Sequence, residues 1–92
     1  MDLQELRSEI DRVDASLVSP FVQRMELSSQ VAVFKKAHAL PVLDTGREQE
    51  KLLSVSSQVP AYLQTDIRAL YELILARSRD RQTAVMRDEV DK

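Results

Sequence analysis

A charged residue lies where the helical pattern of the sequence predicts an apolar one. Arg24 falls at a position of a 3,4 repeat that is otherwise held by Leu3, Ile10, Leu17 and Val31. Burying an unpaired guanidinium at such a position costs several kcal/mol. We therefore expect Arg24 to meet an anionic group.

Lys35 follows Arg24 by eleven residues, which places it only about 20° further around a helix. The two Cα atoms would be roughly 16 Å apart, a gap that two long cationic side chains can narrow around one small anion. The alternative is that both residues form ordinary ion pairs with acidic side chains at a helix interface. Residue type and spacing leave both possibilities open.

Two neutral polar residues interrupt a second apolar stripe. Ser78 and Gln82 are i,i+4 neighbours that continue the stripe begun by Ile67, Tyr71 and Ile74. They would form either a hydrogen-bonded network inside the core or the polar floor of a pocket. Periodicity does not distinguish these alternatives.

Arg7 raises a question of distance. It precedes Arg24 by seventeen residues, so on one helix the two lie roughly 25 Å apart. They cannot hold the same small molecule from one chain, although Arg7 of one chain could approach Arg24 of another in an antiparallel helix dimer. The alternative is an ordinary exposed arginine.

The elements that must position these residues are three helices. Apolar residues with 3,4 spacing predict one long helix from Leu3 to about Ala39, ended by Leu40-Pro41 and kinked or broken at Pro20. Such a helix is roughly 55 Å long, about twice the diameter of a compact domain of this size. The rest of the chain is too short to cover it, which favours a dimer packed through the long helices.

Two shorter helices follow. Thr45 and Glu48 have the spacing of a capping box and predict the start of the second helix. It should end near Ser57, and a third helix should begin at Thr65-Asp66. The sequence thus predicts a single all-α domain over residues 1–92, in which about 83–92 form a frayed tail or a linker stub.

Composition excludes several classes of function. The formal net charge is −2, so no nucleic acid and no anionic membrane is expected as a partner. The chain has no Cys and one His, which argues against a metal site and a thiol nucleophile. The acidic start is unlike a secretory signal, and no apolar run could span a bilayer, so we expect a cytoplasmic protein.

One ordered set of residues extends over nearly the whole chain: Leu6-Arg7, Ile10-Asp11-Arg12-Val13-Asp14, Arg24, Lys35, Asp44-Thr45-Gly46-Arg47-Glu48, Ser78 and Gln82. From about Leu3 to Gln82, the chain resembles the AroQ-class chorismate mutases. The resemblance implies an intertwined homodimer of three-helix protomers. It also implies a Claisen rearrangement of chorismate to prephenate, a step of the shikimate pathway to phenylalanine and tyrosine, without cofactor or metal.

The resemblance also implies roles for the residues of each site. Arg24 and Arg7 of the partner chain would grip the two carboxylates of chorismate. Lys35 and Gln82 would donate to the ether oxygen, and Lys35, Gln82 and Arg24 would be the catalytic residues.

The other four positions would complete the binding site. Glu48, with the backbone near Asp44, would take the ring hydroxyl, whereas Ser78 and Arg47 would support the carboxylate end. A carboxylate that serves the hydroxyl is less free to cap its own helix.

Three further functions compete with this interpretation. One is elimination of pyruvate from isochorismate on the same scaffold. Another is a non-catalytic helical dimerisation or sensor module, although a module that needs only its apolar helix interface would not need Arg24 there. RNA binding rests only on the arginines around Ser78, and the net charge weakens it.

Domains of this kind also occur fused to prephenate dehydratase, prephenate dehydrogenase or an aldolase of the pathway, so a fused or associated enzyme is a further possible partner.

Overall fold

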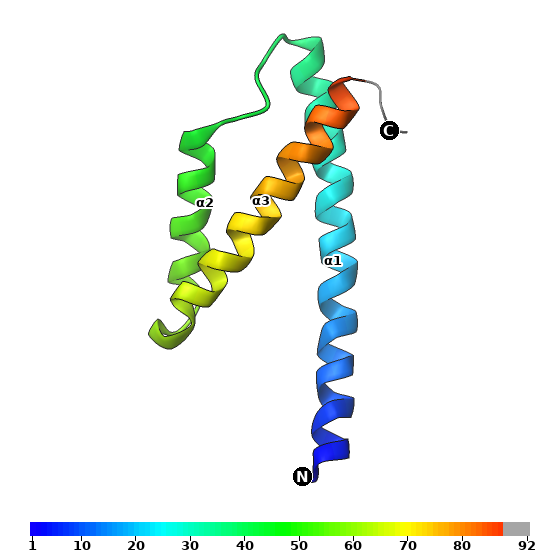
Figure 1. The fold of residues 1–92 in the computed structure, drawn as a ribbon, viewed down its shortest axis with the longest axis vertical. Helices are drawn as coiled ribbons and strands as arrows, with labels where there is room; N and C mark the ends of the chain where they lie inside the picture. The colour runs from blue at the N-terminus through cyan, green and yellow to red at the C-terminus, as the bar shows by residue number, and fades with distance from the viewer. Residues whose placement is uncertain (88–92) are drawn as a thin grey trace.

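The computed structural model describes residues 1–87 and contains only helices over that range. Helix α1 is Leu3–Ala37, α2 is Thr45–Ser57 and α3 is Gln64–Met86, and a short 3₁₀ helix, η1, covers Ala61–Leu63 (Figure 1). The predicted all-α class, with three helices and one long N-terminal helix, is confirmed.

Helix α1 begins and ends at identifiable caps. The Asp2 side chain accepts a hydrogen bond from the Glu5 backbone N–H at 2.8 Å, which satisfies one of the free donors of the first turn. At the other end Ala39 adopts φ 54°, and the Leu40 N–H bonds back to the Lys35 carbonyl at 2.8 Å. This is a Schellman motif, and it ends the helix at Ala37, two residues before the predicted end.

Pro20 does not break α1. The helix is continuous from Leu3 to Ala37, so the predicted alternative of a break is wrong. Residues 11–23 are all exposed in the protomer. The carbonyl that loses its partner at Pro20 can therefore bond to water, which removes much of the cost of a proline inside a helix.

Helix α2 is capped one residue earlier than predicted. Asp44 is the N-cap, and its side chain accepts from the Arg47 N–H at 3.0 Å. The predicted capping box between Thr45 and Glu48 is therefore wrong. Asp is a strong N-cap residue, and a cap at Asp44 leaves the Glu48 side chain free for a contact with another helix. The predicted end at Ser57 is confirmed.

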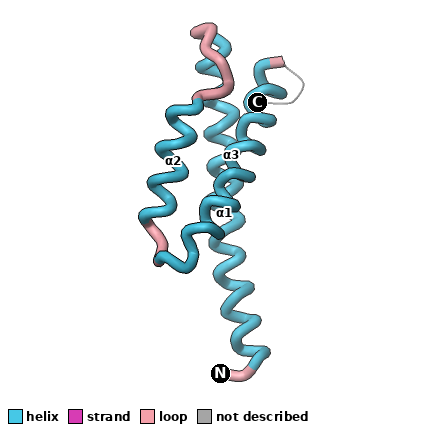
Figure 2. The backbone as a smooth tube through the Cα atoms, turned by 60° about the vertical axis from the view of Figure 1, so that its left-hand side comes forward, coloured by secondary structure: helices cyan, strands magenta, loops and turns pink. Residues whose placement is uncertain are grey.

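Helix α3 is the centre of the fold. It runs in the same direction as α1 and opposite to α2, and it crosses between them (Figures 1 and 2). Over the described residues α3 packs against both helices, whereas the backbones of α1 and α2 do not contact each other.

The C-terminal turn of α3 belongs to the packed domain. We expected fraying from about residue 83, but the helix continues to Met86 and Val85 is fully buried. Ala32 of α1 is also fully buried. Burial of Val85 supplies the apolar contact that holds this turn in place. The rest of the predicted tail, residues 88–92, lies outside the described residues.

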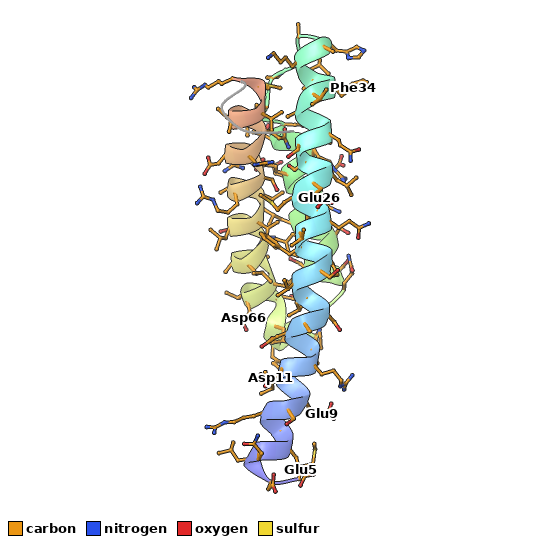
Figure 3. All side chains as sticks on the ribbon, turned by 90° about the vertical axis from the view of Figure 1, so that its right-hand side faces the viewer. Glu5, Glu9, Asp11, Glu26, Phe34 and Asp66 are labelled. Carbon is orange, nitrogen blue, oxygen red and sulfur yellow. The ribbon has the colours of Figure 1, made fainter. Side chains whose placement is uncertain are left out.

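The N-terminal half of α1 packs against nothing in the protomer. Its apolar seam consists of Leu3, Leu6, Ile10, Val13 and Leu17, which are 47% to 62% exposed. Figure 3 shows this end of the helix, with Glu5 and Glu9 labelled, extending past the other two helices. The radius of gyration is 16.3 Å, against roughly 12 Å for a compact domain of this length.

None of the helices described is both long enough and apolar enough to cross a lipid bilayer.

Removing the buried apolar contact at the end of α3 should destabilise the domain. We expect Val85→Ala to lower the free energy of unfolding by about 1–3 kcal/mol, because the cavity is only partly refilled. Leu53→Ala is the control, since it removes more atoms from a side chain that is 67% exposed. Urea denaturation followed by circular dichroism measures both, and equal losses in the two variants would contradict the packing described.

Candidate functional site

The three helices enclose one polar cavity of about 390 Å³. It lies where the C-terminal half of α1, the first turns of α2 and the C-terminal half of α3 face one another. All seven of the same-chain site residues predicted from sequence line it: Arg24, Lys35, Asp44, Arg47, Glu48, Ser78 and Gln82. Residues that are up to fifty-eight positions apart in the chain are thus brought to one cavity.

Arg24 is held by a hydroxyl and by no carboxylate. It is half-buried, and its Nη1 donates to the Oγ of the buried Ser78 at 2.7 Å. Among the described residues no acidic side chain forms an ion pair with Arg24. Within the protomer Arg24 therefore forms no such ion pair, and the guanidinium keeps donors for an anion in the cavity.

Lys35 is in the same situation. Its Nζ donates to the Val42 carbonyl at 2.9 Å, and within residues 1–87 it has no carboxylate partner. An ammonium has three donors, so two remain. The contact with Val42 holds the linker between α1 and α2 against the end of α1. The start of α2 follows this linker directly and lies at the cavity.

Gln82 has the one buried side-chain polar atom, over the described residues, that lacks a hydrogen-bond partner. Its Nε2 donates to Ser28 Oγ at 3.0 Å, whereas Oε1 is buried and unpaired. Ser28 lies 3.5 Å from the Ser78 carbonyl oxygen, to which it donates. Ser78 and Gln82 therefore both join a network between α1 and α3 and line the cavity.

The start of α2 brings one cation and two carboxylates to the cavity. Asp44 caps the helix by accepting from the backbone N–H of Arg47, and the Arg47 side chain lines the cavity. Glu48 is half-buried and forms an ion pair with Arg79 of α3. This contact ties α2 to α3 across the cavity wall.

Sequence reasoning missed seven of the lining residues: Leu27, Ser28, Val31, Val42, Lys51, Leu75 and Arg79. Lys51 follows Arg47 by four residues, so helical spacing alone places it on the same face. Arg79 directly follows Ser78 and looked like one of three dispersed surface arginines. Only the crossing of α3 over α2 brings it to Glu48.

Arg7 does not line the cavity of its own chain. It lies exposed in the N-terminal half of α1, as expected from its distance to Arg24. The structure of one protomer therefore leaves the predicted role of Arg7 untested.

The charges of the cavity suit an anionic ligand. Five cationic side chains (Arg24, Lys35, Arg47, Lys51 and Arg79) and two carboxylates line it. The described residues contain no cluster of three or more His, Cys, Asp or Glu side chains that could hold a metal ion. Unpaired guanidinium and ammonium groups in a partly enclosed cavity favour a carboxylate-bearing small molecule.

Comparison with known proteins agrees with this geometry. Residues 6–83 match the family described as chorismate mutase type II. Over 46 residues, half of this chain, the sequence is 48% identical to a protein of Haemophilus influenzae named T-protein, of which the match covers 12%. Over 46 residues it is also 35% identical to 4-amino-4-deoxychorismate mutase of Streptomyces venezuelae, of which the match covers 45%.

The matched region thus spans less than half the length of either relative. No solved structure gives a significant match. The family match covers most of the helical domain and contains every predicted site residue from Arg7 to Gln82. The chain belongs to the chorismate mutase type II family.

Proposed function

We propose that the protein catalyses the rearrangement of chorismate to prephenate. The observation that carries this proposal is the gathering of the seven same-chain residues around one cavity. Three of them, Arg24, Lys35 and Arg47, have no ion-pair partner among the described residues. Chorismate, with two carboxylates, a ring hydroxyl and an ether oxygen, complements such a set of donors and acceptors.

The reaction needs no proton transfer and no nucleophile. One C–O bond breaks as one C–C bond forms within the same molecule. The protein has to hold the compact conformer, in which the two carbons that will join are close, and to stabilise charge that grows on the ether oxygen. Fixed cations and amide donors can do both.

Arg24 grips one carboxylate of the substrate. Its guanidinium is held at one edge by Ser78, which orients the remaining donors toward the cavity for bidentate binding. Ser78 and Arg47 support this end of the substrate. Arg7 of the partner chain binds the second carboxylate.

Lys35 and Gln82 donate to the ether oxygen. Each keeps a donor that no described residue uses: Lys35 is bound to Val42 through one hydrogen, and Gln82 to Ser28 through one of its two amide hydrogens. Because both groups are anchored before the substrate arrives, little reorganisation is needed as charge develops.

Glu48 accepts a hydrogen bond from the ring hydroxyl, beside the Asp44 end of α2. Its carboxylate stands half-buried at the cavity wall. Because Asp44 caps the helix in its place, the conflict between capping and substrate binding that the sequence suggested does not arise.

The working enzyme is an intertwined homodimer. The exposed apolar seam of α1 supports this, and so does an apolar groove of about 640 Å³ further along α1 that Phe21, Val22, Met25 and Val33 help to line. Burying these side chains against a second copy removes them from water. An antiparallel arrangement carries Arg7 to the partner's Arg24.

Two other substrates are alternatives to chorismate. The Streptomyces relative is named for 4-amino-4-deoxychorismate, and this chain would carry out the same rearrangement on that compound. Isochorismate would instead lose pyruvate.

A sensor that binds without turnover is the non-catalytic alternative. We also propose a fused or associated pathway enzyme as a further partner; the match covers 12% of the T-protein, so that relative extends well beyond the matched region.

Purified protein should consume chorismate, and Arg24→Ala should abolish this. The loss of the carboxylate grip removes substrate binding and orientation together. Loss of chorismate ultraviolet absorbance measures the rate, and NMR of the product distinguishes prephenate from salicylate and pyruvate. A folded dimer that binds a transition-state analogue without turnover would instead be a sensor.

Lys35→Ala and Gln82→Ala should each lower kcat at least about a hundredfold, the scale for losing one donor to a developing oxyanion. Steady-state kinetics with chorismate measure this. Lys36→Ala is the control, because Lys36 is the adjacent exposed lysine and does not line the cavity. Near-native kcat in either site variant would overturn its assignment to the ether oxygen.

Mixing two inactive variants should restore activity if each site is shared between chains. A heterodimer of Arg7→Ala and Arg24→Ala has one site with both arginines and one site with neither. Random exchange then recovers up to about a quarter of wild-type activity, since half of the dimers carry one intact site of two. Heterodimers that are detected by native mass spectrometry but remain inactive would exclude sharing.

A further inference from the structure

Arg79 is a cavity residue that the proposed chemistry does not use. Its guanidinium forms an ion pair with Glu48, and the two side chains are 36% and 23% exposed. The pair joins helices α2 and α3, and both partners line the cavity. Glu48 is the carboxylate assigned to the ring hydroxyl, so Arg79 acts on the group that meets this part of the substrate.

The ion pair changes what Glu48 can bind. Its Oε1 faces Arg79, while Oε2 accepts no hydrogen bond from any described residue. A carboxylate has acceptor positions on both oxygens, so Glu48 can still accept from a hydroxyl. Its negative charge, however, is already balanced by the guanidinium.

A second cation shares a helix face with the same carboxylate. Lys51 is three residues after Glu48 on α2 and also lines the cavity. Positions i and i+3 of a helix share a face. A positive charge on the substrate beside Glu48 would therefore meet two like charges, Arg79 and Lys51. Of the two carboxylates that line the cavity, Glu48 is already paired and Asp44 caps its own helix.

We propose that Arg79 determines substrate specificity at the ring substituent. By pairing with Glu48 it favours a neutral hydroxyl, which needs only an acceptor, over an ammonium, which needs uncompensated negative charge. The protein thereby discriminates chorismate from the analogue in which an amino group replaces the ring hydroxyl. This inference rests on the proposed function.

The test compares kcat/KM for chorismate and for 4-amino-4-deoxychorismate in the same preparation of each variant. The ratio of the two values does not depend on how much of the protein is folded, because both rates scale with active sites. Arg79→Met and Arg79→Gln should each shift the ratio toward the amino compound at least about tenfold, the scale for removing one nearby like charge.

Two controls identify the cause. Arg79→Lys keeps the charge and should leave the ratio within about threefold of wild type. Arg77→Met removes an exposed arginine that pairs with Asp80, away from the cavity, and should leave the ratio unchanged.

The outcomes separate the inference from the proposed function. A wild-type protein that rearranges chorismate, with an unchanged ratio in Arg79→Met and Arg79→Gln, would overturn the role of Arg79 alone. An equal shift in Arg77→Met would overturn it as well. A wild-type protein that turns over no chorismate would overturn the proposed function and this inference with it.

Discussion

The packing of α3 against α1 is the interaction on which the site depends. Ser28 and Ser78 are buried at this contact, where small side chains let two helix backbones approach closely. Arg24 donates to Ser78 and Gln82 donates to Ser28. The same contact therefore holds the domain together and positions the groups that face the cavity. The residues that stabilise the fold and those that build the site are in part the same residues.

Residues that break an apolar pattern were enough to single out Arg24, Ser78 and Gln82, but not to choose between a pocket and an internal network. A guanidinium on a seam and two hydrogen-bonding groups on a core stripe are costly unless something compensates them, and the structure places Arg24, Ser78 and Gln82 in one cavity. The resemblance supplied what the pattern left open. It selected a pocket over an internal network, and it added Asp44, Arg47 and Glu48 from another helix.

What sequence reasoning could not give depends on contacts between elements. The ion pair of Glu48 with Arg79 joins residues that are thirty-one positions apart, and local spacing carries no signal for it. The position of the N-cap of α2 was also not predictable from sequence, because Asp44 and Thr45 are both good N-cap residues and local propensity does not choose between them. Val85 looked like the start of a charged tail because its partner surface lies on another helix.

The protomer leaves two features without a partner: the apolar seam of α1 and the cationic cavity between the three helices. The apolar seam remains in water, and the cations of the cavity have too few carboxylates beside them. In the proposed dimer a second α1 covers the seam and carries Arg7 to the cavity, which adds a sixth cation and increases the repulsion there. A dianionic ligand relieves that repulsion, and in the proposed dimer it would gain a cationic partner that the single protomer lacks. In the proposed dimer, substrate binding and dimerisation would therefore be thermodynamically linked, because a ligand that binds one state in preference stabilises that state by mass action.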